Sequence, residues 1–145
     1  MSILEDIQEI YRSYQEEYSQ VVKKARFGEG LFGFGVGPKN HPCHTQFAER
    51  LEKCLNEADL QSADPAQIRE LLAFMFDAPL NCRGDEDPKY WMLLAVQKLT
   101  LDLIPLLAPD DARTLATKYA YDYPRHKRLE LQNKVLAALF KQESL

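Results

Sequence analysis

The chain has 145 residues, of which 46% are hydrophobic and 28% charged, a composition typical of a folded domain and unlike that of a disordered segment. The formal net charge of −4 argues against a general nucleic-acid binder, and no apolar run reaches the length of a membrane span. The three cysteines show no C-x-x-C spacing, so a disulfide framework is not expected and a reducing, cytoplasmic location is the simplest interpretation.

The first predicted element is a long helix that begins after Ser2. Ser2 and Glu5 have the spacing of a capping box, in which each side chain accepts a hydrogen bond from the other residue's backbone N–H. Apolar residues then recur every three or four positions, at Ile3, Ile7, Ile10, Tyr14, Val21 and Ala25. This spacing predicts one buried stripe on a helix of about six or seven turns, which we expect to stop at Gly28.

A glycine-rich segment follows, RFGEGLFGFGVGPKNHPCH from Arg26 to His44, and five of the six glycines lie between Gly28 and Gly37. The first three glycines spell G-x-G-x-x-G, but a dinucleotide fingerprint needs a strand before the glycines and a helix directly after them. Neither is predicted here, so we favour a connector whose phenylalanines pack on the helices. The alternative is an interaction loop in which Phe32 and Phe34 contact a partner or a second copy of the chain.

The segment ends on His41, Cys43 and His44, the one local group of metal-ligand and nucleophile types in the sequence. If Pro42 opens a helix, Cys43 lies in its first turn, where free amides favour a thiolate and a neighbouring histidine can act as a base. This arrangement suggests a small thiol- or metal-dependent enzyme or sensor. The spacing lacks the paired ligands of structural zinc sites, and Cys43 precedes Phe47 by one helical turn. We therefore expect a buried, inert Cys43, with neither a metal nor a cofactor.

Prolines mark the start of five further predicted helices, because proline is favoured at the first helical position. They are Pro42, Pro65, Pro88, Pro109 and Pro124. The helix from Pro88 to about Ile104 is apolar nearly all round and is expected at the centre. The last, from Pro124 to Gln142, is expected to bury Leu129 and Phe140. The predicted fold is all-α: a compact bundle of about six helices in one domain, residues 1–145, with one long Gly/Phe-rich loop after the first helix.

The charge is unevenly distributed along the chain. Residues 112–145 carry seven basic and three acidic residues, a net +4, whereas residues 1–111 carry eleven and nineteen, a net −8. The basic residues are densest in the segment 124–128, which contains Arg125, His126, Lys127 and Arg128. Cations in the first turn of a helix oppose its dipole, and such local conflicts are typical of functional sites. These side chains are candidates for binding an anion or an acidic partner.

The sequence contains no complete catalytic motif. The favoured interpretation is a non-catalytic protein-interaction or regulatory module that contacts a protein partner or associates with itself. Two alternatives stay open: the enzyme or sensor centred on His41, Cys43 and His44, and a polyanion-binding module that uses residues 124–128. The overall acidity disfavours nucleic acid as the polyanion, and membrane contact is not expected.

Overall fold

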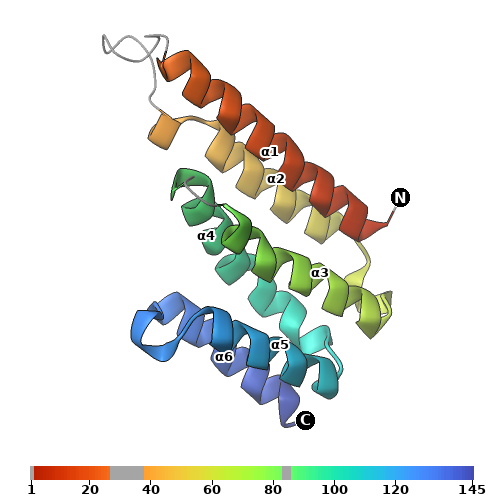
Figure 1. Ribbon diagram of the computed structural model, residues 1–145. Coiled ribbons are helices and arrows are strands. Elements are labelled where there is room, and N and C mark those ends of the chain that lie inside the picture. Colours follow the sequence, from red (N-terminus) through yellow and green to blue (C-terminus); the bar gives the residue numbers. More distant parts are fainter. Residues whose placement is uncertain (1, 27–37, 83–85) are drawn as a thin grey trace. The chain divides into compact units, whose positions relative to one another are not determined.

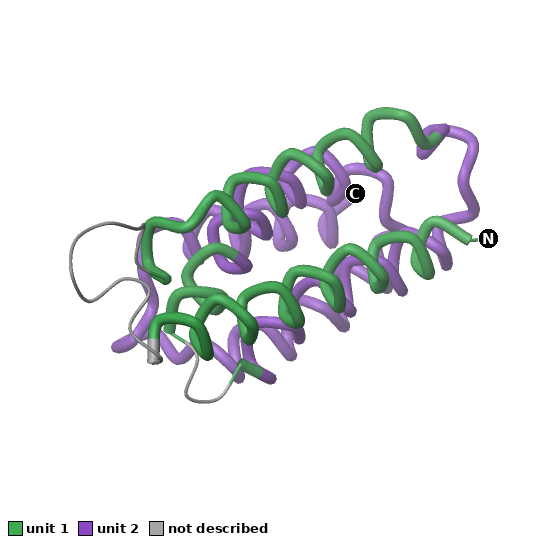
Figure 2. Tube along the Cα trace, turned by 90° about the horizontal axis from the view of Figure 1, so that it is seen from above, with its two compact units in different colours: residues 1–58, 82–91 green, residues 59–81, 92–145 purple. Residues whose placement is uncertain are grey.

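The computed structural model describes residues 2–26, 38–82 and 86–145. Within them the chain forms six α-helices joined by short 3-10 turns and no strand, so the predicted all-α class is confirmed (Figure 1). Two compact units are present (Figure 2): unit 1 consists of residues 1–58 and 82–91, and unit 2 of residues 59–81 and 92–145. The expected Gly/Phe-rich loop, with Phe32 and Phe34, lies outside the described residues. The single domain 1–145 stays a prediction.

Unit 1 is built on two long helices, α1 (Ile3–Arg26) and α2 (Cys43–Glu57), which run side by side (Figure 1). The Ser2 hydroxyl accepts a hydrogen bond from the Glu5 backbone N–H at 3.1 Å, as the capping motif predicts. Apolar side chains at helical spacing are buried where the two helices meet: Ile7, Tyr11, Tyr14, Phe47, Leu51 and Leu55. The short turn η1 (Pro38–Asn40) also packs on α1.

Unit 1 also includes a segment from much later in the chain, residues 82–91, which contains the start of α4 (Glu86–Leu103). Side chains of α1 hold this segment. The Tyr18 hydroxyl donates a hydrogen bond to the Asp87 carboxylate at 3.0 Å, and the Gln15 amide donates to Cys82 Sγ at 3.9 Å. The helix starts two residues before the predicted Pro88, because Glu86 and Asp87 occupy its first turn, where carboxylates are favoured by the dipole.

Unit 2 contains α3 (Pro65–Asp77), residues 92–103 of α4, α5 (Pro109–Asp122) and α6 (Glu130–Glu143). Within this unit α5 contacts both α3 and α6. Its buried apolar side chains are Ile68, Leu71, Leu72, Met75, Met92, Leu103, Leu115, Tyr119, Val135 and Leu139. None of the described helices combines the length and the apolar character that crossing a bilayer requires.

The last helix starts later than the sequence predicts. Residues Arg125–Lys127 form the 3-10 turn η5, and α6 begins at Glu130 instead of Pro124. The reason is local: Leu129 is extended, with ψ at 159°, and its backbone N–H donates to the Gln132 side chain at 2.8 Å, which caps α6. The basic residues therefore do not oppose an α-helix dipole, and that prediction is wrong. Leu129 and Phe140, predicted to be buried, are 58% and 52% exposed.

Candidate functional site

The three candidate residues at the start of α2 are close together, and the first of them caps the helix. His41 precedes α2, and its Nδ1 accepts a hydrogen bond from the Cys43 backbone N–H at 3.0 Å. This bond satisfies one of the free N–H groups that every helix start presents. While the bond is made, Nδ1 of His41 is occupied as an acceptor and does not serve as a base.

His44 is 1% exposed and uses both of its ring nitrogens. Nε2 lies 2.7 Å from the Pro38 carbonyl oxygen, and Nδ1 lies 2.6 Å from the Tyr14 hydroxyl. Because a carbonyl only accepts, Nε2 donates to Pro38, whereas the Tyr14 hydroxyl, which can donate or accept, bonds Nδ1. The imidazole also stacks on Trp91, with 5.5 Å between ring centroids and 3° between planes. His44 therefore joins α1, η1 and the start of α4 within unit 1.

Cys43 is also buried, with 1% of its surface exposed. Burial raises the pKa of its thiol to about 11, and the nearby Glu17 carboxylate contributes in the same direction. Hydrogen bonds from backbone N–H groups at the helix start act the other way, as the position predicts. Desolvation outweighs them, so the thiol stays protonated at neutral pH. The expectation of a buried Cys43 is confirmed, and the residue lacks the exposure and the low pKa of a nucleophile.

Cys43 is expected to react slowly with iodoacetamide in the native protein. With a pKa of about 11, its thiolate fraction at pH 7.5 is roughly 300-fold below that of a free cysteine, whose pKa is about 8.5. Burial slows the reaction further. Cys54, which is half-buried on α2, provides an internal comparison and should react first. Peptide mass analysis after brief labelling measures both rates, and faster labelling of Cys43 than of Cys54 would contradict the assignment.

The described residues offer no ligand set for a metal. Among residues 2–26, 38–82 and 86–145, no three His, Cys, Asp or Glu side chains lie close enough together to hold an ion. All three cysteines are free. A metal site at His41, Cys43 and His44 would therefore have no further ligand from the described part of the chain.

The basic segment predicted from the sequence, which we call the cationic turn (residues 124–128), connects α5 to α6 in unit 2 (Figure 1). Arg125, His126 and Lys127 are exposed, whereas Arg128 is half-buried. Arg128 Nε donates a hydrogen bond to the Tyr123 carbonyl at 2.9 Å, which fixes its position. Within the described residues, no carboxylate forms an ion pair with any of these side chains. The turn thus presents uncompensated positive charge.

Sequence reasoning missed a groove at the start of α4 in unit 1, which we call the aromatic groove. It has a volume of roughly 540 Å³ and is lined by Lys39, Asn40, Glu86, Asp87, Tyr90 and Trp91. That volume is typical of small-ligand sites. The Tyr90 and Trp91 rings meet edge to face at 5.9 Å. The available signal was the mixture of acidic and aromatic residues in DEDPKYW, residues 85–91.

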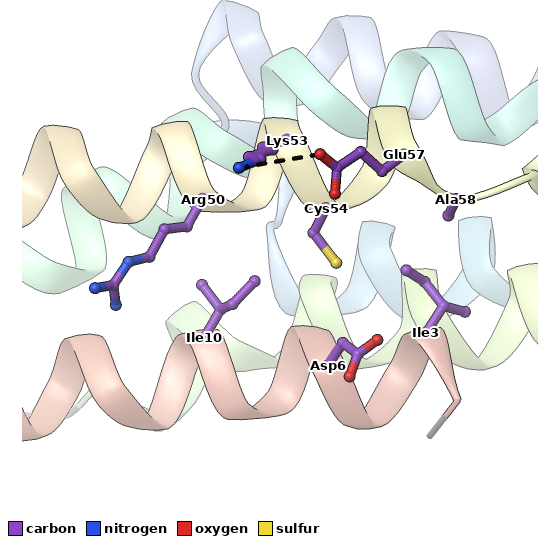
Figure 3. A pocket seen from close by; sticks show the side chains of 8 residues that line it. All are labelled: Ile3, Asp6, Ile10, Arg50, Lys53, Cys54, Glu57 and Ala58. Atoms are coloured by element: carbon purple, nitrogen blue, oxygen red, sulfur yellow. Dashed lines mark ion pairs between the residues drawn. The ribbon is translucent and has the colours of Figure 1, made fainter.

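A second groove in unit 1 runs between α1 and α2 and is shown in Figure 3. It has a volume of roughly 470 Å³ and is lined by Ile3, Asp6, Ile10, Arg50, Lys53, Cys54, Glu57 and Ala58. The Cys54 sulfur points toward α1 in this view, and burial raises the pKa of its thiol. Lys53 and Glu57 form an exposed ion pair at 4.0 Å. With two acidic and two basic residues around it, the groove shows no charge preference.

Comparisons with models of protein families, with curated proteins and with solved structures gave no match to the chain.

Proposed function

We propose that the protein is a non-catalytic interaction module that binds an acidic segment of a protein partner. The binding surface is the cationic turn together with the apolar side chains on either side of it, Tyr121 and Leu129. One observation carries the proposal: three cations, Arg125, Lys127 and Arg128, stand within four residues of one another, and none of them pairs with a carboxylate in the described part of the chain.

The cations of unit 2 differ in their surroundings. Three of them are neutralised by carboxylates at 2.7–3.3 Å, in the ion pairs Arg69–Asp111, Arg113–Glu143 and Lys118–Asp77. Arg125, Lys127 and Arg128 stand within four residues and pair with no carboxylate in the described part of the chain. Their mutual repulsion falls when acidic groups of a partner approach. Charge complementarity therefore favours an acidic occupant, and it accelerates association.

Large exposed apolar side chains flank the same turn. Tyr121, in the last turn of α5, is 84% exposed, and Leu129, just before α6, is 58% exposed. Tyrosine and arginine are enriched in protein interfaces and in the residues that dominate their affinity. A surface that combines these residue types suits a protein segment better than a free inorganic anion, because the anion gains nothing from the apolar contacts.

The alternatives from the sequence have less support. A thiol enzyme needs an accessible thiolate and a free base, whereas Cys43 is buried and both ring nitrogens of His44 are bonded. Nucleic-acid binding is opposed by the net charge of −4, since affinity for phosphates grows with the number of cations engaged.

The proposal is tested by fluorescence anisotropy at low salt with a fluorescein-labelled acidic peptide. The peptide is a single leucine with five glutamates on each side. Wild-type protein is expected to bind, and the double substitution Arg125→Glu with Lys127→Glu is expected to weaken binding by about tenfold or more. Added salt should weaken the wild-type complex, because the charges at the turn are exposed. Arg128 is left unchanged, since its hydrogen bond to Tyr123 supports the turn itself.

The matched control is Lys23→Glu with Lys24→Glu, which makes the same change in net charge at exposed positions of α1 in unit 1. This control should retain most of the affinity. Equal losses in both double variants, or no binding by the wild type, would refute the proposal. A DNA oligonucleotide of eleven bases that binds more tightly than the peptide would also refute it. Sedimentation of the protein alone shows whether it forms a dimer. A dimer that dissociates when the cationic turn is substituted would mean that the turn binds a second copy of the chain and not another protein.

A further inference from the structure

We propose that the aromatic groove of unit 1 is a binding site for a singly charged organic cation, an ammonium or guanidinium group. This site lies in the other unit from the cationic turn and carries the opposite charge preference, so it is independent of the proposed function. Three properties of the described residues carry it: the lining chemistry, the fixed positions of the lining side chains and the balance of charge.

The lining combines the two features that recognise organic cations. Tyr90 and Trp91 place two aromatic rings on the groove, and the negative face of such a ring attracts a cation, most strongly for tryptophan. Glu86 and Asp87 place two carboxylates on the same groove. Tyr90 is 60% exposed although it is large and apolar. A ligand with a positive centre and an apolar surface would cover its ring.

Two of the lining side chains, Asp87 and Trp91, are held in place before any ligand arrives. The Tyr18 hydroxyl donates to Asp87 Oδ2 at 3.0 Å, which orients that carboxylate. The Trp91 ring stacks on His44, and His44 is fixed in turn by Tyr14 and by the Pro38 carbonyl. Side chains that are already ordered lose little conformational freedom on binding, and this improves affinity for a small ligand.

Charge on the groove favours one positive group. Two carboxylates face one ammonium, that of Lys39. The structure shows no ion pair for Glu86 with another described residue, so its carboxylate is available to a ligand. A single positive group on a ligand neutralises the one excess negative charge of this lining. The cation can belong to a free small molecule or to an arginine or lysine side chain of a peptide.

Trp91 is the only tryptophan in the chain, so its fluorescence reports on this groove directly. We expect a saturable change in Trp91 emission on titration with tetramethylammonium or methylguanidinium chloride, with half-saturation on the order of 10 mM. Sodium chloride at equal ionic strength and the neutral isostere tert-butanol should leave the emission unchanged. A blocked arginine dipeptide distinguishes the two sources: tighter binding than methylguanidinium indicates a peptide ligand, and equal or weaker binding indicates a small molecule.

Two variants assign the effect to the groove. Tyr90→Ala and Glu86→Gln are each expected to weaken binding about two- to fivefold, the range that an exposed cation–aromatic contact and an exposed ion pair supply. Both residues are exposed, so the fold should not change. Tyr121→Ala in unit 2 and Glu49→Gln on α2 are the matched controls and should bind as the wild type does. No response up to about 50 mM, an equal response to tert-butanol, or unchanged binding in both groove variants would overturn the proposal.

Discussion

Replacing Phe47 by alanine is expected to lower the free energy of unfolding by about 3–5 kcal/mol, the usual cost of removing a buried phenylalanine ring. Phe47 is 1% exposed and lies between α1 and α2. Its ring stacks on Tyr14 at 4.2 Å and meets Tyr11 edge to face at 5.0 Å. Alanine would leave a cavity beside both tyrosines. Urea unfolding followed by Trp91 fluorescence, which reports on unit 1, measures the loss.

Phe140→Ala provides the matched control, because it removes the same side chain at a position that is 52% exposed on α6. Its expected cost is within about 1 kcal/mol, measured by circular dichroism because Phe140 lies in unit 2 and Trp91 reports on unit 1. If Phe47→Ala does not fold, Phe47→Leu gives a smaller loss that still exceeds that of Phe140→Leu. An equal loss of unfolding free energy at the two positions would contradict the prediction that Phe47 is part of a hydrophobic core between α1 and α2.

Replacing His44 by alanine is the second large effect that we expect, about 2–4 kcal/mol of lost stability. The substitution leaves the buried Tyr14 hydroxyl and the part-buried Pro38 carbonyl without their partner. An unsatisfied buried polar group costs about 1–3 kcal/mol, and the stack on Trp91 is lost as well. Urea unfolding measures this variant too, with circular dichroism as the signal because the substitution alters the surroundings of Trp91.

A double-mutant cycle isolates the bond between His44 and Tyr14. Tyr14→Phe keeps the ring stack on Phe47 and removes only the hydroxyl, and His44→Gln keeps a donor for Pro38. The two substitutions are expected to couple by about 1 kcal/mol, since the double variant loses the bond only once. Tyr121→Phe, which removes a hydroxyl at an 84% exposed position, serves as the control and should change stability little. A coupling energy near zero would show that the bond contributes nothing to stability.

Most helix positions could be predicted because they depend on neighbouring residues. Proline fixes its own backbone and stabilises the first helical turn, so the starts of α3 at Pro65 and of α5 at Pro109 are as predicted, and α2 begins one residue after Pro42. The same rule failed at Pro124. Gln132 caps α6 from within the helix, but Leu129 has no side-chain oxygen that would complete a recognisable capping motif.

The surroundings of the candidate residues could not be predicted in the same way. The sequence favoured a buried Cys43, because the residue shares a helical face with Phe47. It did not indicate that His44 would bond Tyr14 and stack on Trp91, since these residues are 30 and 47 positions away in the chain. Contacts across such separations depend on how the helices pack, and a single sequence carries no direct signal of them. The aromatic groove was missed for the same reason.

Unit 1 includes residues 82–91, which follow α3 of unit 2 in the sequence. A fragment that ends at residue 58 would therefore lack Asp87, the acceptor for Tyr18, and Trp91, the ring that covers His44. A single backbone cut between residues 58 and 59 has a different consequence. We expect the two resulting peptides to stay together through the contacts of Cys82, Asp87 and Trp91 with the first peptide, so that the protein could be reassembled from two separately produced halves.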